Sequence, residues 1–157
     1  MDKLTAGALA GLIATAPMSA TMLLLRNAWP ETREAPLPPE IVTAEAADEV
    51  GVRDDLGETG LQAATVAGHF AYGAAAGALY AVAASKTRQP ISTGVAAGLA
   101  LWAAGYFGWV PALGLMAPAH RQPAERNTMM IAAHVVWGAT TGALVEAMTS
   151  DGTDRPG

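Results

Sequence analysis

The sequence contains no cysteine, and this absence excludes disulfide bonds, thiolate metal sites, iron–sulfur clusters and thiol nucleophiles. Charged residues make up only 15% of the chain, against about 25% in an average soluble protein. The formal net charge is -5, so no basic surface is expected for nucleic acid. No nucleophile elbow, phosphate-binding loop or zinc motif is present. The sequence therefore gives no support to an enzyme, a zinc protein or a nucleic-acid-binding protein.

Hydrophobic residues, by contrast, form 52% of the chain and collect in four stretches without Asp, Glu, Lys or Arg. These stretches cover residues 4–25, 61–84, 91–119 and 127–144. A helix needs about 20 residues to cross a hydrocarbon core of about 30 Å. One charge at the bilayer centre costs about 2.5–3.5 kcal/mol. We therefore predict an all-α integral membrane four-helix bundle, one domain over residues 1–157, with spans at 4–25, 61–84, 91–110 and 127–148.

Two other interpretations fit these stretches less well. A soluble bundle needs a polar helix face with charges at a 3.6-residue period, and none of the four stretches has one. Lys3 and the small residues around Ser19 loosely resemble a signal peptide. The apolar run continues to Leu25, however, which is too long for that segment. We expect an uncleaved first span with a kink at Pro17.

The longest polar segment, residues 26–60, is an acidic loop outside the membrane with nine Asp and Glu residues. Pro39 is well placed to begin a short helix over about 39–50, which Gly51 would end. An apolar stripe of Ile41, Val42, Ala46 and Val50 makes this helix amphipathic. It is predicted to lie on the membrane surface or on the bundle, and a lid or a partner-docking element is the alternative.

The second and fourth spans resemble each other. His69 is followed by Tyr72, and His134 by Trp137, at a constant offset of 65 residues. The first and third spans show a fainter likeness, which predicts two repeated helical hairpins. Each span carries two glycines four residues apart, a spacing that brings membrane helices close together. These candidate helix-packing pairs are Gly7 and Gly11, Gly73 and Gly77, Gly94 and Gly98, and Gly138 and Gly142.

His69 and His134 are the only histidines within the spans, and they occupy equivalent positions of the repeat. Each imidazole can simply bond to a neighbouring helix, and the pair can also pass a proton or ligate a haem. If the glycine faces draw these two helices together, no room is left for a porphyrin. If the glycines pack on the first and third spans instead, the histidines face a wider gap. We expect no metal site and no cofactor, with haem b as the alternative.

Three short motifs carry a resemblance to a known family. They are Ala67-Gly68-His69, Gly114-Leu115 with Pro118, and the segment from His134 to Trp137. Together they resemble the YagU-like group of small, poorly characterised bacterial inner-membrane proteins over roughly the last three spans. The resemblance implies a plasma-membrane location and no assigned reaction.

Three functional hypotheses follow. The first is a non-enzymatic scaffold or accessory subunit whose partners are the lipid bilayer and a second copy or another membrane protein, reached through the glycine faces. The second is a small-solute or proton conduit through the histidine pair, and the third is a bis-histidine haem protein. Lys86 and Arg88 are dense in a very short loop, so we expect both termini to be cytoplasmic.

Overall fold

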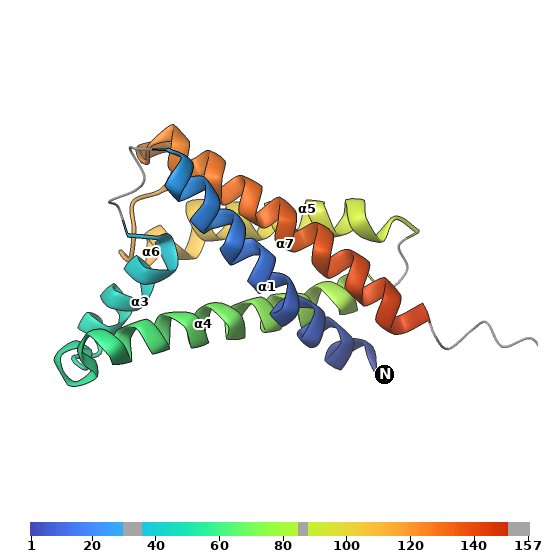
Figure 1. The fold of residues 1–157 in the computed structure, drawn as a ribbon, viewed down its shortest axis with the longest axis horizontal. Coiled ribbons are helices and arrows are strands. Elements are labelled where there is room, and N and C mark those ends of the chain that lie inside the picture. The colour runs from blue at the N-terminus through green and yellow to red at the C-terminus, as the bar shows by residue number, and fades with distance from the viewer. Residues whose placement is uncertain (30–35, 85–87, 151–157) are drawn as a thin grey trace, which may run out of the picture.

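A computed structural model of the chain describes residues 1–29, 36–84 and 88–150, and this part is helical, with no strand. Figure 1 shows the arrangement of the helices. In chain order they are α1 (Lys3–Ala28), α3 (Pro38–Glu49), α4 (Arg53–Ala83), α5 (Pro90–Ala104), the π-turn η1 (Gly105–Trp109), α6 (Val110–Ala112), the 3₁₀ turn η2 (Ala119–Arg121) and α7 (Ala124–Ser150).

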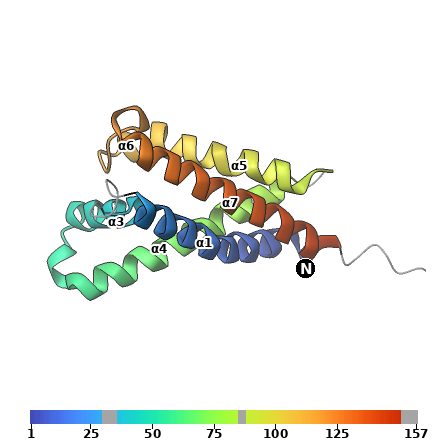
Figure 2. The same cartoon turned by 45° about the horizontal axis from the view of Figure 1, so that its top comes forward.

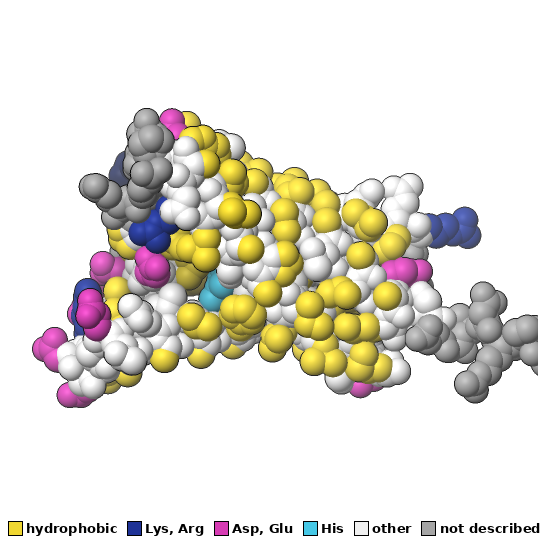
Figure 3. All heavy atoms as spheres, viewed as in Figure 1, with side chains coloured by type: hydrophobic (Ala, Val, Ile, Leu, Met, Phe, Trp, Pro, Cys, Tyr) yellow, Lys and Arg dark blue, Asp and Glu magenta, His cyan; other side chains and the backbone are white. Residues whose placement is uncertain are grey.

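Four helical segments are long and apolar enough to cross a membrane: α1, α4, the segment Pro90–Ala112, and α7. Their surfaces are largely uncovered, since only 22% of the most apolar window of α4 is buried. Leu24 on α1 and Leu79 on α4 are 70% and 73% exposed. Charged side chains gather toward the two ends of the molecule, with an apolar region between them (Figure 3). The prediction of four apolar helices long enough to cross a membrane is confirmed. Their exposed apolar side chains suit contact with lipid rather than with water.

The ends of the helices follow local chemistry. Asp2 caps α1, accepting hydrogen bonds from the hydroxyl of Thr5 at 2.7 Å and from its backbone N–H at 3.0 Å. These two bonds, the hydroxyl's first, hold the pKa of the Asp2 carboxyl below its usual value. The helix continues through Pro17 to Ala28. The N-terminus and the end of α7 lie at one end of the molecule, and α3 lies at the other (Figure 1).

Two glycine-lined contacts build the two hairpins. A Cβ atom placed on Gly7 or Gly11 of α1 would fall closer than 3.0 Å to backbone atoms of Gly77 or Gly73 on α4. Gly94 and Gly98 of α5 meet α7 in the same way, at the backbones of Gly138 and His134. In Figure 2, α5 and α7 run side by side while α1 crosses α4. Such close approach requires glycine, because any side chain would separate the helix backbones.

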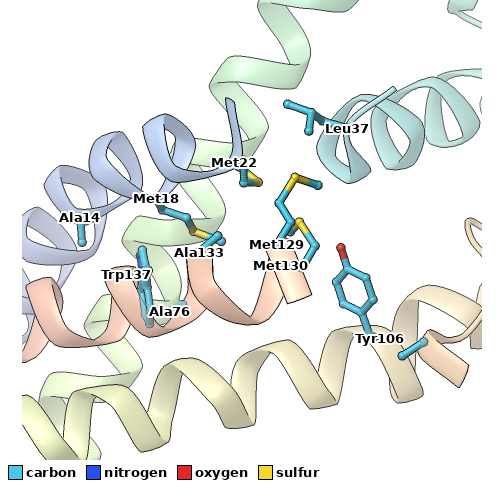
Figure 4. Packing of buried hydrophobic residues seen from close by; sticks show 11 residues of the cluster. Ala14, Met18, Met22, Leu37, Ala76, Tyr106, Met129, Met130, Ala133 and Trp137 are labelled. Atoms are coloured by element: carbon cyan, nitrogen blue, oxygen red, sulfur yellow. The ribbon is translucent and has the colours of Figure 1, made fainter. Parts of the chain in front are cut away.

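The two hairpins meet through α1 and α7, which pack along each other. Figure 4 shows Met18 and Met22 of α1 beside Met129 and Met130 of α7, with Trp137 nearby. All five side chains are buried. The indole Nε1–H of Trp137 donates a hydrogen bond to the carbonyl oxygen of Gly11 at 3.1 Å. Flexible thioethers fill the irregular space here, and the indole adds a polar link between the hairpins.

Two helices depart from regular geometry. α4 begins at Arg53, rather than at residue 61, and Gly57 interrupts it with a φ of 59° that favours glycine. The third span continues beyond Ala104 as the π-turn η1, before Pro111 in α6. A π-turn changes the direction of the side chains that follow it and often occurs at functional sites. Here it precedes Val110, whose side chain is buried.

Candidate functional site

A cavity that opens to the surface lies between the helices in the described part of the chain. Its volume is about 370 Å³, and it is lined by side chains of α1, α3, α4, α5, the π-turn and α7. A space-filling view shows the surface hollowed beside α3, with a histidine side chain visible in the hollow (Figure 3). The cavity exists because α4 and α5 barely meet, whereas α1 and α7 pack closely.

His134 of α7 lines the cavity and is only 7% exposed. Its Nδ1 lies 2.7 Å from the backbone carbonyl oxygen of Met130, one turn earlier on the same helix. A carbonyl can only accept, so Nδ1 must carry the proton that it donates. In the neutral imidazole, Nε2 is then an acceptor. Because Nδ1 is tied to its own helix, the opposite edge of the ring, with Nε2, points away from α7.

His69 of α4, the histidine that the predicted repeat pairs with His134, lines the same cavity. The Nε2 atom of His69 is buried and has no hydrogen-bond partner among the described residues. Buried polar atoms are normally paired, so an atom of this kind needs an explanation.

Aromatic side chains complete the middle of the cavity. Tyr72 of α4 and Trp109 of the π-turn have ring centroids 6.0 Å apart, and both line the cavity together with Trp137. The indole of Trp137 is 2% exposed and hydrogen-bonded within the core, so it is not an anchor at the membrane interface. Trp102 stacks on Tyr106 and meets Phe107 edge to face, and none of these three side chains lines the cavity.

α3 covers the cavity at one end of the molecule. Leu37 precedes the helix and donates its backbone N–H to the carboxylate of Glu40 at 2.7 Å, which fixes the first turn. Val42, Thr43 and Ala46 then face the cavity. Of the apolar stripe predicted for this helix, Val50 does not take part, because it is 70% exposed. α3 packs on α4.

The lining of the cavity contains no Asp, Glu, Lys or Arg side chain from the described residues. Nor do those residues contain a group of three or more His, Asp or Glu side chains that could hold a metal ion. A buried charge needs a partner, and the cavity offers none. Its chemistry therefore suits an uncharged molecule with a hydrogen-bonding group near the histidines.

The glycine faces of α4 and α7 lie against α1 and α5, not against each other. Of the two arrangements that the sequence left open, the one in which the glycines draw the two histidine helices together is therefore excluded. The alternative arrangement, with the histidines facing a wider gap, is the one observed. All four glycine pairs are also used within the chain, which leaves none of them free to bind a partner.

Several lining residues could not be recognised from the sequence. Thr15 and Met18 belong to α1, far from the histidines in sequence, and only the packing of α1 on α7 brings them to the cavity. The apolar stripe on α3 was the one sequence signal for a covering element.

Comparisons with known proteins give one match. A family model described as a protein of unknown function, DUF1440, matches residues 30–143. No curated protein and no solved structure matches the chain significantly. The matched region begins before α3, so it includes the loop helix that the resemblance to YagU-like proteins left out. It also contains both histidines and most of the cavity lining. Because the match covers more than half of the chain, the protein belongs to the DUF1440 family.

Proposed function

We propose that the protein is a non-enzymatic membrane protein that binds a small, uncharged and largely apolar molecule in the cavity between α4 and α5. The observation that carries this proposal is a cavity of about 370 Å³ that opens to the surface between the four long apolar helices. Ligand sites are typically apolar cavities of about 300–1,000 Å³ with a few polar groups. Here His69 and His134 are those groups.

The size of the cavity limits its occupant. An apolar cavity of about 150 Å³ accommodates benzene, so the volume observed suits a molecule of about two fused rings. A haem has about forty non-hydrogen atoms, against about six in benzene, so on the same scale it is too large unless α3 moves away. A two-ring ligand is therefore the better match to the cavity than haem.

The other hypotheses have weaker support. Scaffolding through glycine faces would need exposed glycine pairs, and these pairs are occupied inside the chain. A proton or ion path would need polar or charged side chains to replace water, and the described lining contains only two histidines and three threonines beside the tyrosine and the indoles.

Blocking the cavity tests the proposal. A Cβ atom on Gly68, which lines the cavity, meets nothing within 4 Å, so Gly68→Leu has room for its side chain without disturbing a helix contact. We expect the wild-type protein in nanodiscs to bind one naphthalene per chain in excess of protein-free nanodiscs. Gly68→Leu is expected to reduce this binding at least about tenfold, because its volume competes directly with the ligand. Equilibrium dialysis measures both.

Ala67→Leu is the matched control, because Ala67 is exposed and does not line the cavity. It should bind naphthalene like the wild type. Ala64→Phe offers a second way to fill the cavity from the same helix. Absence of naphthalene binding to the wild-type protein would refute the proposal, as would equal binding by all four proteins.

We further propose that the protein lies in a bacterial plasma membrane, as the resemblance to YagU-like proteins implies, with both termini in the cytoplasm. The chain has no cysteine, so single-cysteine variants report topology directly. Glu45→Cys on α3 should react with a membrane-impermeant maleimide in intact bacterial cells. Arg88→Cys, before α5, should react only after permeabilisation. Both side chains are exposed, and their segments lie at opposite ends of the molecule (Figure 1). The reverse labelling pattern would place the termini outside.

A further inference from the structure

The orientation of His134 restricts the chemistry of the molecule that the cavity can hold. Its Nδ1–H is already used by the carbonyl oxygen of Met130. Nε2 of the neutral ring is therefore the free position, and it accepts a hydrogen bond but does not donate one. A ligand that meets this atom must bring its own donor, such as a hydroxyl group. A carbonyl, an ether or a nitrile would leave the acceptor without a partner, at a cost.

The absence of charged side chains from the described lining limits the ligand further. A carboxylic acid or a phosphate would need a cationic partner when ionised, and an amine would need an acidic one. No charged side chain from the described residues lines the cavity. The donor must therefore belong to a group that is uncharged at neutral pH.

Three aromatic side chains line the cavity together with His134. Trp137 lies one turn later on α7, and Tyr72 and Trp109 form a ring pair that also lines the cavity. Aromatic rings prefer edge-to-face or offset contacts with other rings, and these contacts add to the gain from burial. An aromatic ring therefore uses this lining better than an alkyl chain of equal volume.

We propose that the cavity binds a neutral aromatic hydroxyl compound, a phenol or hydroquinone of about two-ring size, with its hydroxyl donating a hydrogen bond to Nε2 of His134. This inference rests on the proposed function and specifies its ligand class. Thr15, Thr43 and Thr65 add hydroxyls to the lining, and those of Thr15 and Thr65 donate to a carbonyl of their own helix. We assign the contact to His134 rather than to His69, because the bond from Nδ1 of His134 to Met130 fixes its free nitrogen as an acceptor.

The test compares naphthalene, 1-naphthol, 1-methoxynaphthalene and 1-decanol by equilibrium dialysis against the wild-type protein in nanodiscs at neutral pH. Each value is corrected for partition into protein-free nanodiscs. We expect 1-naphthol to bind about threefold to tenfold more tightly than 1-methoxynaphthalene, the range of one net hydrogen bond. We also expect 1-decanol to bind more weakly than 1-naphthol.

Two variants assign the contact. His134→Phe should remove the preference for 1-naphthol and still bind naphthalene, because the ring volume is kept. His69→Phe, at the equivalent position of the repeat, should keep the preference. If His134→Phe does not fold, the wild-type comparison of 1-naphthol with its methyl ether still decides.

The outcomes separate this inference from the proposed function. If naphthalene binds but 1-naphthol has no advantage over the ether, the cavity is a binding site and the hydroxyl assignment is wrong. A preference abolished by His69→Phe alone would overturn the choice of His134. Equal binding of 1-decanol and 1-naphthol would overturn the aromatic assignment. If none of the compounds binds, the proposed function itself fails.

Discussion

Replacing Gly77 with leucine is expected to separate α1 from α4 and to lower the free energy of unfolding by at least about 3 kcal/mol, the upper range for overpacking a core. A Cβ atom on Gly77 would lie closer than 3.0 Å to the carbonyl oxygen of Gly7 and to backbone atoms of Gly11. Helix backbones cannot rotate away as a side chain can. SDS titration of the protein in detergent micelles, followed by circular dichroism, measures the loss.

The matched control lies on the same helix. Gly68→Leu adds the same side chain where nothing lies within 4 Å, so its unfolding free energy should stay within about 1 kcal/mol of the wild type. Gly77→Ala should fall between the two, because even one methyl group overlaps the backbone of α1. If Gly77→Leu unfolds like Gly68→Leu, the close crossing of α1 and α4 is refuted.

The helices themselves were predictable from the sequence because their cause is local. Four uncharged stretches of sufficient length leave the backbone no partner in lipid except itself. The short loop helix, predicted at 39–50 and observed at Pro38–Glu49, follows equally from Pro39 at its start and Gly51 after its end. Those signals need only neighbouring residues.

The cavity was not predictable, because it comes from a difference between the two hairpins. Exact twofold symmetry would pack α4 on α5 as closely as α1 packs on α7. The loop of the first hairpin carries α3, which has no counterpart in the second, and Leu37 before it joins the core beside Met22 and Met129. α3 also packs on α4 and lines the cavity. No local pattern in the sequence shows that α4 and α5 stay apart while α1 and α7 pack together.

For the two histidines, the sequence predicted one feature and left another open. Their equivalent positions in the repeat predicted that they act as a pair, and the structure places both in one cavity. Which ring nitrogen is free, however, depends on the bond from His134 to the carbonyl of Met130. A helical histidine can also turn toward a neighbouring helix, so its sequence position does not fix this choice.

Trp137→Ala is expected to lower the free energy of unfolding by about 3 kcal/mol, at the lower end of the range for large aromatic truncations. The indole is 2% exposed, packs with Met18, Met130 and Ala133, and reaches across to α1 through its bond to Gly11. Its loss removes contacts on both hairpins at once. The same SDS titration, read by circular dichroism because the change removes a fluorophore, measures the effect.

A second substitution at Trp137 separates packing from hydrogen bonding, and a substitution at Tyr72 serves as the comparison. Trp137→Phe keeps much of the ring volume and loses the bond to Gly11, so we expect a cost of about 1 kcal/mol, typical of a hydrogen bond between membrane helices. Tyr72→Ala, at the equivalent position of the first hairpin, should cost less than Trp137→Ala because Tyr72 is 41% exposed. Equal losses at Trp137 and Tyr72 would mean that both interfaces are packed alike. An indole that joins α7 to α1 should contribute more to the free energy of unfolding than a tyrosine side chain that is 41% exposed. Equal losses would therefore mean that the difference in packing between the two interfaces, which creates the cavity, is absent.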